Sequence, residues 1–288
     1  MTDLRGLGTA LVTPFKSDGS IDFEALKRLL DKQIAGRVDY LVVLGTTGEA
    51  ATLSTDERLQ VRTFVKDYIA GRLPLVLGVG GNNTAAVCET LQNDDLTGFA
   101  AILSVCPYYN KPSQEGLFRH FCAIAESSPL PVILYNVPGR TGVNLLPETV
   151  MRIYNAHPDK IIGIKEASGN LDQIKHLISL AKEQAITNRQ LSIISGDDGL
   201  AAEVMQAGGV GLISVLSNAF PEEAGRLVRE ADKTLQTALN PLISLLFKEG
   251  NPAGIKTVLA QQGVIANILR LPLVPNSLAV QEEIKLKI

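Results

Sequence analysis

Short apolar runs rich in valine, isoleucine and leucine recur along the chain, and longer helical patterns separate them. This alternation predicts βαβ units around a parallel sheet. The pattern gives about eight candidate strands. These are residues 8–14, 39–45, 73–80, 99–105, 131–137, 160–166, 191–197 and 210–215.

Eight strand–helix units before about residue 225 are typical of a (β/α)₈ TIM barrel, whose usual size is about 250 residues. The remaining sequence has amphipathic helical patterns such as TLQTALNPLISLLFKEG with no strands between them. We therefore predict that residues 1–224 form a barrel carrying the active site and residues 225–288 form a small C-terminal helical domain. Periodicity alone leaves a doubly wound open sheet as the alternative.

Polar or glycine residues stand at the expected ends of two helices. Asp22 precedes FEALKRLLDKQIAG, and Ser54 is followed three residues later by Glu57, as in a capping box. Gly36 and Gly71 follow these two patterns. Each glycine is expected to adopt the left-handed conformation that often ends a helix.

Composition limits the partners of this 288-residue chain. Its formal charge of −3, from 27 basic and 30 acidic residues, provides no basic stripe for nucleic acid and no polybasic segment for a membrane surface. The N-terminal sequence does not resemble a secretory leader, and no apolar run reaches membrane-spanning length. We expect small-molecule partners or further copies of the chain.

Three cysteines, Cys88, Cys106 and Cys122, fit neither a disulfide framework nor paired metal ligands. Such sparse cysteine is typical of the reducing cytoplasm, where we expect the protein to act. Cys106 near a strand end is interpreted as a core residue, with a nucleophile as the alternative.

No nucleotide or phosphate motif is complete. GVGGNN has Asn83 where the third glycine of a dinucleotide fingerprint is needed, and GTTGE lacks the lysine of a P-loop. The loop after the seventh strand carries Asp197 and Asp198, which would repel an anion. A phosphorylated substrate is therefore disfavoured.

The histidines His120, His157 and His176 are isolated, so we expect no metal and no other cofactor. The paired acids of SGDDG could bind a divalent ion, but acids in such a loop more often cap the next helix.

Lys165 ends the sixth candidate strand in IIGIKEASGN. On strict alternation it shares a face with Ile161 and Gly163, while Ile162 and Ile164 lie on the other face. Barrel active sites are built at this C-terminal end of the strands.

A lysine surrounded by isoleucines is expected to be buried, which favours the neutral amine, a nucleophile towards carbonyl carbon. The alternative is an ordinary lysine that forms a salt bridge, for example with Glu166. Tyr135 closes the fifth candidate strand and Thr46 follows the second, and both could relay protons during imine formation, although Tyr135 could equally be a core aromatic residue. Arg140 in PGRTG can bind a carboxylate through its guanidinium, or can simply be solvated. These residues predict imine chemistry on a carboxylate-bearing, unphosphorylated substrate.

Five motifs in order resemble those of the dihydrodipicolinate synthase and N-acetylneuraminate lyase family. They are GTTGE (45–49), CPYYNKPSQEG (106–116), YNVPGRTG (135–142), IKEASGN (164–170) and SGDDG (195–199). The resemblance runs from about Leu7 through the C-terminal helices. It implies a (β/α)₈ barrel with a C-terminal helical domain and commonly a homotetramer.

The resemblance also implies roles for individual residues. Lys165 matches the lysine that holds pyruvate as a Schiff base, and Tyr135 and Thr46 match the residues that relay protons. Thr47 matches the residue that binds the pyruvate carboxylate, and Tyr109 matches the tyrosine that reaches into a neighbouring subunit's site.

Two further positions, Gly196 and Ile213, match residues that line the pocket. The threonine pair in GTTGE and Arg140 look like the synthase branch, in which the arginine would hold the carboxylate of L-aspartate 4-semialdehyde. That branch condenses pyruvate with the semialdehyde on the route to lysine and diaminopimelate. The alternatives are another pyruvate-dependent aldolase of the family, such as a sugar-acid lyase, and a binding protein without chemistry.

One departure concerns feedback. Synthases inhibited by lysine resemble one another in carrying histidines after GTTGE and an acid on a later helix, where this chain has Thr55, Arg58 and Ala86. Asn82 and Tyr108 do fit that pattern. We therefore expect weak or absent inhibition by lysine.

Overall fold

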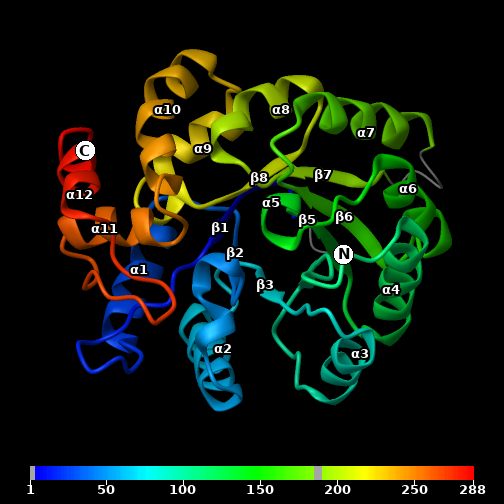
Figure 1. Cartoon of the computed structure of the whole chain (residues 1–288), viewed down its shortest axis with the longest axis horizontal. Helices are drawn as coiled ribbons and strands as arrows, with labels where there is room; N and C mark the ends of the chain where they lie inside the picture. Colours follow the sequence, from blue (N-terminus) through cyan, green and yellow to red (C-terminus); the bar gives the residue numbers. More distant parts are fainter. Residues whose placement is uncertain (1–3, 185–189) are drawn as a thin grey trace.

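The computed structural model describes residues 4–184 and 190–288, and within these ranges eight parallel strands close into a barrel (Figure 1). The strands follow one another around the barrel in sequence order, and β8 pairs with β1. Their bounds are β1 Gly6–Ala10, β2 Tyr40–Val43, β3 Leu75–Gly78, β4 Ala101–Val105, β5 Val132–Asn136, β6 Ile161–Glu166, β7 Ser192–Ser195 and β8 Gly211–Ser214. Closure confirms the (β/α)₈ prediction and excludes the open sheet.

Helices surround the barrel, and a short helix, α5 (Pro138–Thr141), lies in the loop after β5 (Figure 1). The surrounding helices are α1 Phe23–Ala35, α2 Thr55–Ile69, α3 Thr84–Asn93, α4 Gln114–Ser127, α6 Pro147–Ala156, α7 Leu171–Glu183, α8 Ala201–Ala207 and α9 Pro221–Arg229. Short 3₁₀ turns follow three strands: η1 Thr46–Gly48 and η2 Ala50–Thr52 follow β2, η3 Asp198–Leu200 follows β7, and η4 Leu216–Asn218 follows β8.

The predicted helix ends are mostly confirmed. Asp22 accepts a hydrogen bond from Ala25 N, Ser54 and Glu57 form a capping box, and Gly71 is left-handed with φ +78°. Gly36 was expected to be left-handed as well, and this is wrong, because its φ is −77°. A Cβ at this position would lie 2.2 Å from Pro221 Cγ, so close packing of α1 against α9 explains the glycine.

Strand β1 begins and ends earlier than predicted. It covers Gly6–Ala10 rather than residues 8–14, because Val12 N donates to the side chain of Asn218 instead of continuing the ladder. The Asn218 amide also donates to Ala10 O. The buried side chain of Asn218 therefore replaces backbone hydrogen bonds at the end of β1, where the pairing of β1 with β8 stops.

Strand β6 contains an irregularity that strict alternation does not predict. Val132 pairs with Ile161 but Ile133 pairs with Gly163, so Ile162 is an extra residue. Ile161 and Ile164 both belong to the outer core between strands and helices, while Ile162 packs against the core inside the barrel. Two predictions are therefore wrong: that Ile161 shares a face with Lys165, and that Ile162 shares the other face with Ile164.

Three more helices follow the barrel: α10 Lys233–Phe247, α11 Ala253–Gln261 and α12 Leu278–Lys285. They lie together next to α9 at one side of the ring (Figure 1). The domain boundary after residue 224 stays a prediction, and α9 runs across it. No helix among the described residues is both long enough and apolar enough to span a membrane.

Candidate active site

Lys165 and Tyr135 meet at the C-terminal end of the barrel. They are partners in the β5–β6 register, and Lys165 Nζ lies 4.4 Å from the centroid of the Tyr135 ring. Both side chains are buried, with Lys165 only 5% exposed. Within the described residues Lys165 Nζ has neither a carboxylate partner nor a hydrogen bond, so its nitrogen is available to a ligand.

Gly196, which follows β7, makes room for the lysine side chain. A Cβ at this position would lie 2.9 Å from Lys165 Cε and 3.0 Å from Lys165 Cγ. These contacts are closer than van der Waals packing allows, so any larger residue would displace the lysine. Ile213, on β8, is fully buried in the same inner core as Tyr135.

Glu166 does not pair with Lys165, which removes the salt-bridge alternative. Its carboxylate accepts hydrogen bonds from Asn136 Nδ2 at 3.0 and 3.2 Å and from Ser168 N at 2.8 Å. Burial raises the pKa of Glu166 above its ordinary value, while these hydrogen bonds act in the opposite direction. Nearby Cys106 is also buried, and burial raises the pKa of its thiol, which disfavours the nucleophilic thiolate.

The GTTGE loop places its two threonines differently. Thr46 is exposed, whereas Thr47 is 2% exposed and its Oγ1 accepts a hydrogen bond of 3.0 Å from Asn251 Nδ2. Among the described residues, no hydrogen bond joins Thr46 to Tyr135. The structure therefore brings Lys165 and Tyr135 into contact but leaves Thr46 outside that contact.

Arg140 and Tyr109 are exposed and come from neighbouring loops. Arg140, in α5, donates from Nη2 to Asn251 O at 3.3 Å. Tyr109 N donates to Thr141 O at 3.3 Å, so the backbone of its loop is attached to α5. The Tyr109 side chain is 89% exposed, and its backbone is left-handed with φ +75°.

The two acids of SGDDG have separate structural roles. Asp197 caps η3 by accepting from Gly199 N at 2.8 Å, as expected. Asp198 is buried and instead accepts hydrogen bonds from the Ser214 hydroxyl and from two backbone N–H groups after β8. Burial raises the pKa of Asp198, and the hydrogen bonds oppose that change. No group of three or more potential metal ligands occurs in residues 4–184 and 190–288.

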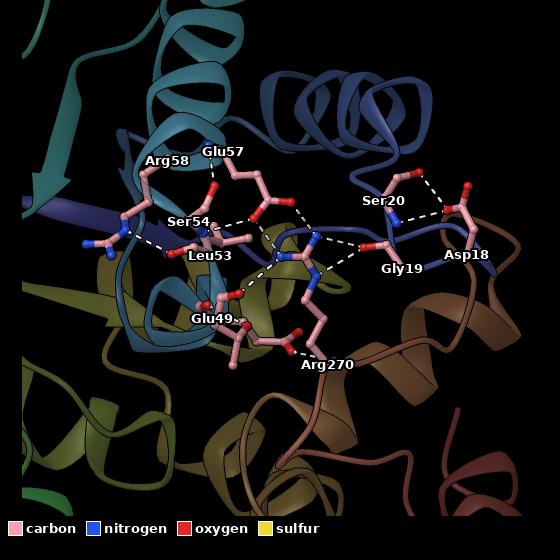
Figure 2. Close-up of polar contacts among 10 residues, drawn as sticks. Asp18, Gly19, Ser20, Glu49, Leu53, Ser54, Glu57, Arg58 and Arg270 are labelled. Atoms are coloured by element: carbon pink, nitrogen blue, oxygen red, sulfur yellow. Dashed lines mark hydrogen bonds and ion pairs between the residues drawn. The ribbon is translucent and has the colours of Figure 1, made fainter.

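Sequence reasoning missed the contacts that the C-terminal segment makes with the GTTGE loop. Lys256, in α11, forms an ion pair with Glu49, and both side chains are 0% exposed. Burial lowers the pKa of Lys256 to about 8, while Glu49 favours its charged form. Figure 2 shows Arg270 beside this loop, where its backbone N donates to Glu49 and its guanidinium pairs with Glu57. GTTGE was recognised as a motif, but nothing local in the sequence points to these partners.

Comparison with known proteins relates the whole chain to one group. Residues 3–288 match the model of the dihydrodipicolinate synthetase family. The chain is 48% identical over 290 residues to a 4-hydroxy-tetrahydrodipicolinate synthase of Parabacteroides distasonis, covering 98% of this chain and 95% of the relative.

Solved structures agree with the sequence match. A dihydrodipicolinate synthase of Thermotoga maritima has 40% identity and a TM-score of 0.93, covering 98% of this chain and 97% of that one. The Acinetobacter baumannii dihydrodipicolinate synthase complexed with pyruvate has 37% identity and a TM-score of 0.93, covering 99% of this chain and 98% of that one. On sequence and fold together, the chain is a member of the dihydrodipicolinate synthetase family.

Proposed function

We propose that this chain condenses pyruvate with L-aspartate 4-semialdehyde to give 4-hydroxy-tetrahydrodipicolinate, with Lys165 forming a Schiff base to pyruvate. The observation that carries the proposal is the buried amine of Lys165, which lies on the Tyr135 ring without an acidic partner among the described residues. Relatives about half identical over nearly the whole chain are named for this reaction.

The proposed reaction balances as a condensation that loses one water. Lys165 Nζ attacks the keto carbon of pyruvate, and the carbinolamine loses water to form an imine. Removal of a methyl proton gives an enamine, whose carbon attacks the aldehyde carbon of the second substrate. The amino group of that substrate then displaces Lys165, which closes the ring and restores the free lysine.

The neighbouring residues are proposed to bind and to move protons. Tyr135 donates and accepts the protons of imine formation, in a relay with Thr46 and with Tyr109 from a second copy of the chain. The exposure of Tyr109 supports this last assignment, because a side chain that is 89% exposed in one chain is free to enter a neighbour's site. We expect Tyr109→Phe to lower kcat about 10-fold or more. Near-normal turnover of this variant would contradict the shared relay.

Recognition of the substrates is assigned to carboxylate-binding groups. Thr47 binds the pyruvate carboxylate, Arg140 binds that of the semialdehyde, and Gly196 and Ile213 line the pocket. The assembly is proposed to be a homotetramer acting in the cytoplasm without a cofactor.

One comparison of substrates tests the proposed function. Purified protein should turn over pyruvate with L-aspartate 4-semialdehyde far faster than it cleaves N-acetylneuraminate. Faster cleavage of the sugar acid would assign the chain to the lyase branch. Absence of any borohydride-trapped pyruvate adduct would point to a binding protein.

Lysine is proposed to inhibit weakly or not at all, because Thr55, Arg58 and Ala86 do not offer the charge pattern of lysine-sensitive enzymes. Arg58 is also engaged locally, donating from Nε to Leu53 O at 3.2 Å. Turnover measured against increasing lysine should change little up to about ten times the concentration of the substrates. Half-maximal inhibition at low lysine concentration would contradict the proposal.

A further inference from the structure

Asn251 links the C-terminal segment to both proposed carboxylate-binding residues. It lies between α10 and α11, and its side chain is buried. Its Nδ2 donates to Thr47 Oγ1 at 3.0 Å, and its backbone O accepts from Arg140 Nη2 at 3.3 Å. One residue far away in the sequence therefore contacts the two groups that would hold the two substrates.

The hydrogen bond to Thr47 determines what the threonine hydroxyl can do. A hydroxyl has one hydrogen to donate and accepts through its lone pairs. Because the Asn251 amide already donates to this oxygen, the Thr47 hydrogen is left to point at another acceptor. Among the described residues Thr47 Oγ1 donates no hydrogen bond, so the hydroxyl is free to donate to a ligand such as a carboxylate.

The other end of the Asn251 amide is also informative. Asn251 Oδ1 is buried and has no hydrogen-bond partner in the described parts of the chain. Buried polar atoms are nearly always paired in native proteins, so an unpaired acceptor marks a place that a bound group or an ordered water completes. The unpaired Oδ1 supports a position of this amide at the edge of a ligand site rather than inside a closed network.

The loop that carries Thr47 is held firmly relative to Asn251. Two residues after Thr47, Glu49 forms its buried ion pair with Lys256 of α11 and accepts from Arg270 N at 3.2 Å. Figure 2 shows Glu49 and Arg270 side by side, with Arg270 also reaching Glu57 and Gly19. The C-terminal segment thus holds the GTTGE loop at several points, which fixes the geometry between the Asn251 amide and the Thr47 hydroxyl.

We infer that Asn251 is a positioning residue that orients the Thr47 hydroxyl as a hydrogen-bond donor to the carboxylate of the keto-acid substrate, and that supports Arg140 through its backbone oxygen. The inference rests on the proposed function of the same site. The C-terminal segment would then take part in substrate recognition. The side chain of Asn251 would affect the binding of the keto acid only.

Asn251→Asp tests the assignment, because a carboxylate cannot donate to Thr47 Oγ1 and instead would accept the Thr47 hydrogen. We expect the half-saturating pyruvate concentration to rise about 10–100-fold, as for loss of a hydrogen bond to a charged group together with a repelling charge. The KM for the semialdehyde should change less than about 3-fold, since the backbone contact with Arg140 does not depend on the side chain.

The matched control is Asn276→Asp. Asn276 is a buried asparagine of the same C-terminal segment that contacts Thr257 and Glu249 instead of the loop. It should leave both substrate constants unchanged. Equal losses for both substrates at Asn251, or the same pyruvate effect at Asn276, would overturn the inference.

Two additions keep the test decisive. Asn251→Ala removes the donor without adding charge, should act in the same direction, and serves if the aspartate variant does not fold. In a protein that already carries Thr47→Val, adding Asn251→Ala should not raise the half-saturating pyruvate concentration further. A further rise as large as that of Asn251→Ala alone would contradict the assignment.

The readout can be separated from synthase activity. The pyruvate concentration that half-saturates borohydride trapping on Lys165 needs no second substrate. A wild-type protein that forms the adduct but does not consume the semialdehyde would refute the proposed function, and the Asn251 variants would still test pyruvate binding. Unchanged half-saturation in both Asn251 variants would refute the inference alone.

Discussion

The tripeptide Gly-Ile-Lys occurs twice in this chain, at residues 163–165 and 254–256, and both lysines are buried against an aromatic ring. Lys165 Nζ lies 4.4 Å from the Tyr135 ring centroid, and Lys256 Nζ lies 4.2 Å from that of Phe15. Lys256 also pairs with Glu49 and donates to Ile268 O at 2.9 Å. Lys165 has no such partners among the described residues.

Burial and an aromatic neighbour therefore do not make a lysine reactive. The partners of Lys256 use its hydrogens and favour its charged form, so that the side chain joins α11 to the GTTGE loop. Lys165 stands near the end of β6, its nitrogen makes no hydrogen bond or ion pair with residues 4–184 and 190–288, and Gly196 leaves space beside its stem. The difference lies in the surrounding groups rather than in the local sequence.

Removal of the Lys165 amine should produce the largest effect. Lys165→Ala is expected to lower kcat/KM at least about 10³-fold, because the proposed nucleophile is lost, while the unfolding transition remains cooperative. Lys160→Ala is the control, since Lys160 precedes the other end of the same strand and donates to Ser128 O at 2.7 Å. If the Lys165 and Lys160 variants had similar turnover, Lys165 would not be the nucleophile. The proposed difference between Lys165 and Lys256 would then be wrong.

Removal of the Lys256 amine should affect stability first. Lys256→Met leaves the buried Glu49 carboxylate without its cation and is expected to lower the free energy of unfolding by about 3–5 kcal/mol. Adding Glu49→Gln should recover part of this loss, because the unpaired charge is gone. Urea unfolding measures both variants. A loss below about 1 kcal/mol, or no recovery in the double variant, would show that the pair is not structural.

The partly buried ion pair of Glu57 with Arg270 in the same region should respond to acid. Hydrogen bonds from Arg270 lower the pKa of Glu57 from 4.5 to about 2. A carboxyl whose pKa is lowered on folding contributes stability above the unfolded pKa and loses it as the pH falls. We expect Glu57→Gln to cost about 1–2 kcal/mol at pH 7, and the difference from wild type to shrink between pH 4.5 and 2.

Glutamine can preserve the capping box with Ser54, so the Glu57 substitution isolates the ionic contribution. Asp56→Asn, one residue earlier and exposed, is the matched control and should show no comparable loss with pH. A constant difference between Glu57→Gln and wild type from pH 7 to 3 would contradict the assignment.

Elements that repeat along the chain were predictable, because each repeat imposes the same physical pattern. The eight apolar runs became the eight strands, and Lys165 could be placed at the end of β6 because a polar residue closes an apolar run. The extra residue at Ile162 could not be predicted, since the shift exists only in the pairing of β6 with β5.

Contacts between segments that are far apart in the sequence could not be predicted, because no local pattern identifies the partner. Asn251 reaches Thr47 across 204 residues, and only the fold brings them together. Lys256 lies in α11, in which Ala253–Leu259 are all buried, and its partner Glu49 is 207 positions earlier in the chain. The resemblance identifies Gly196, but only the folded structure shows its physical reason, which is the space that Lys165 needs.

The central claim is that only one of the two buried Gly-Ile-Lys amines forms a covalent bond to a keto acid. Incubation with pyruvate and borohydride, followed by peptide mapping, tests it directly. The reduced adduct should appear on the peptide containing Lys165 and not on the one containing Lys256, with none on any peptide of Lys165→Ala. An unmodified Lys165, or an adduct on Lys256, would contradict the account.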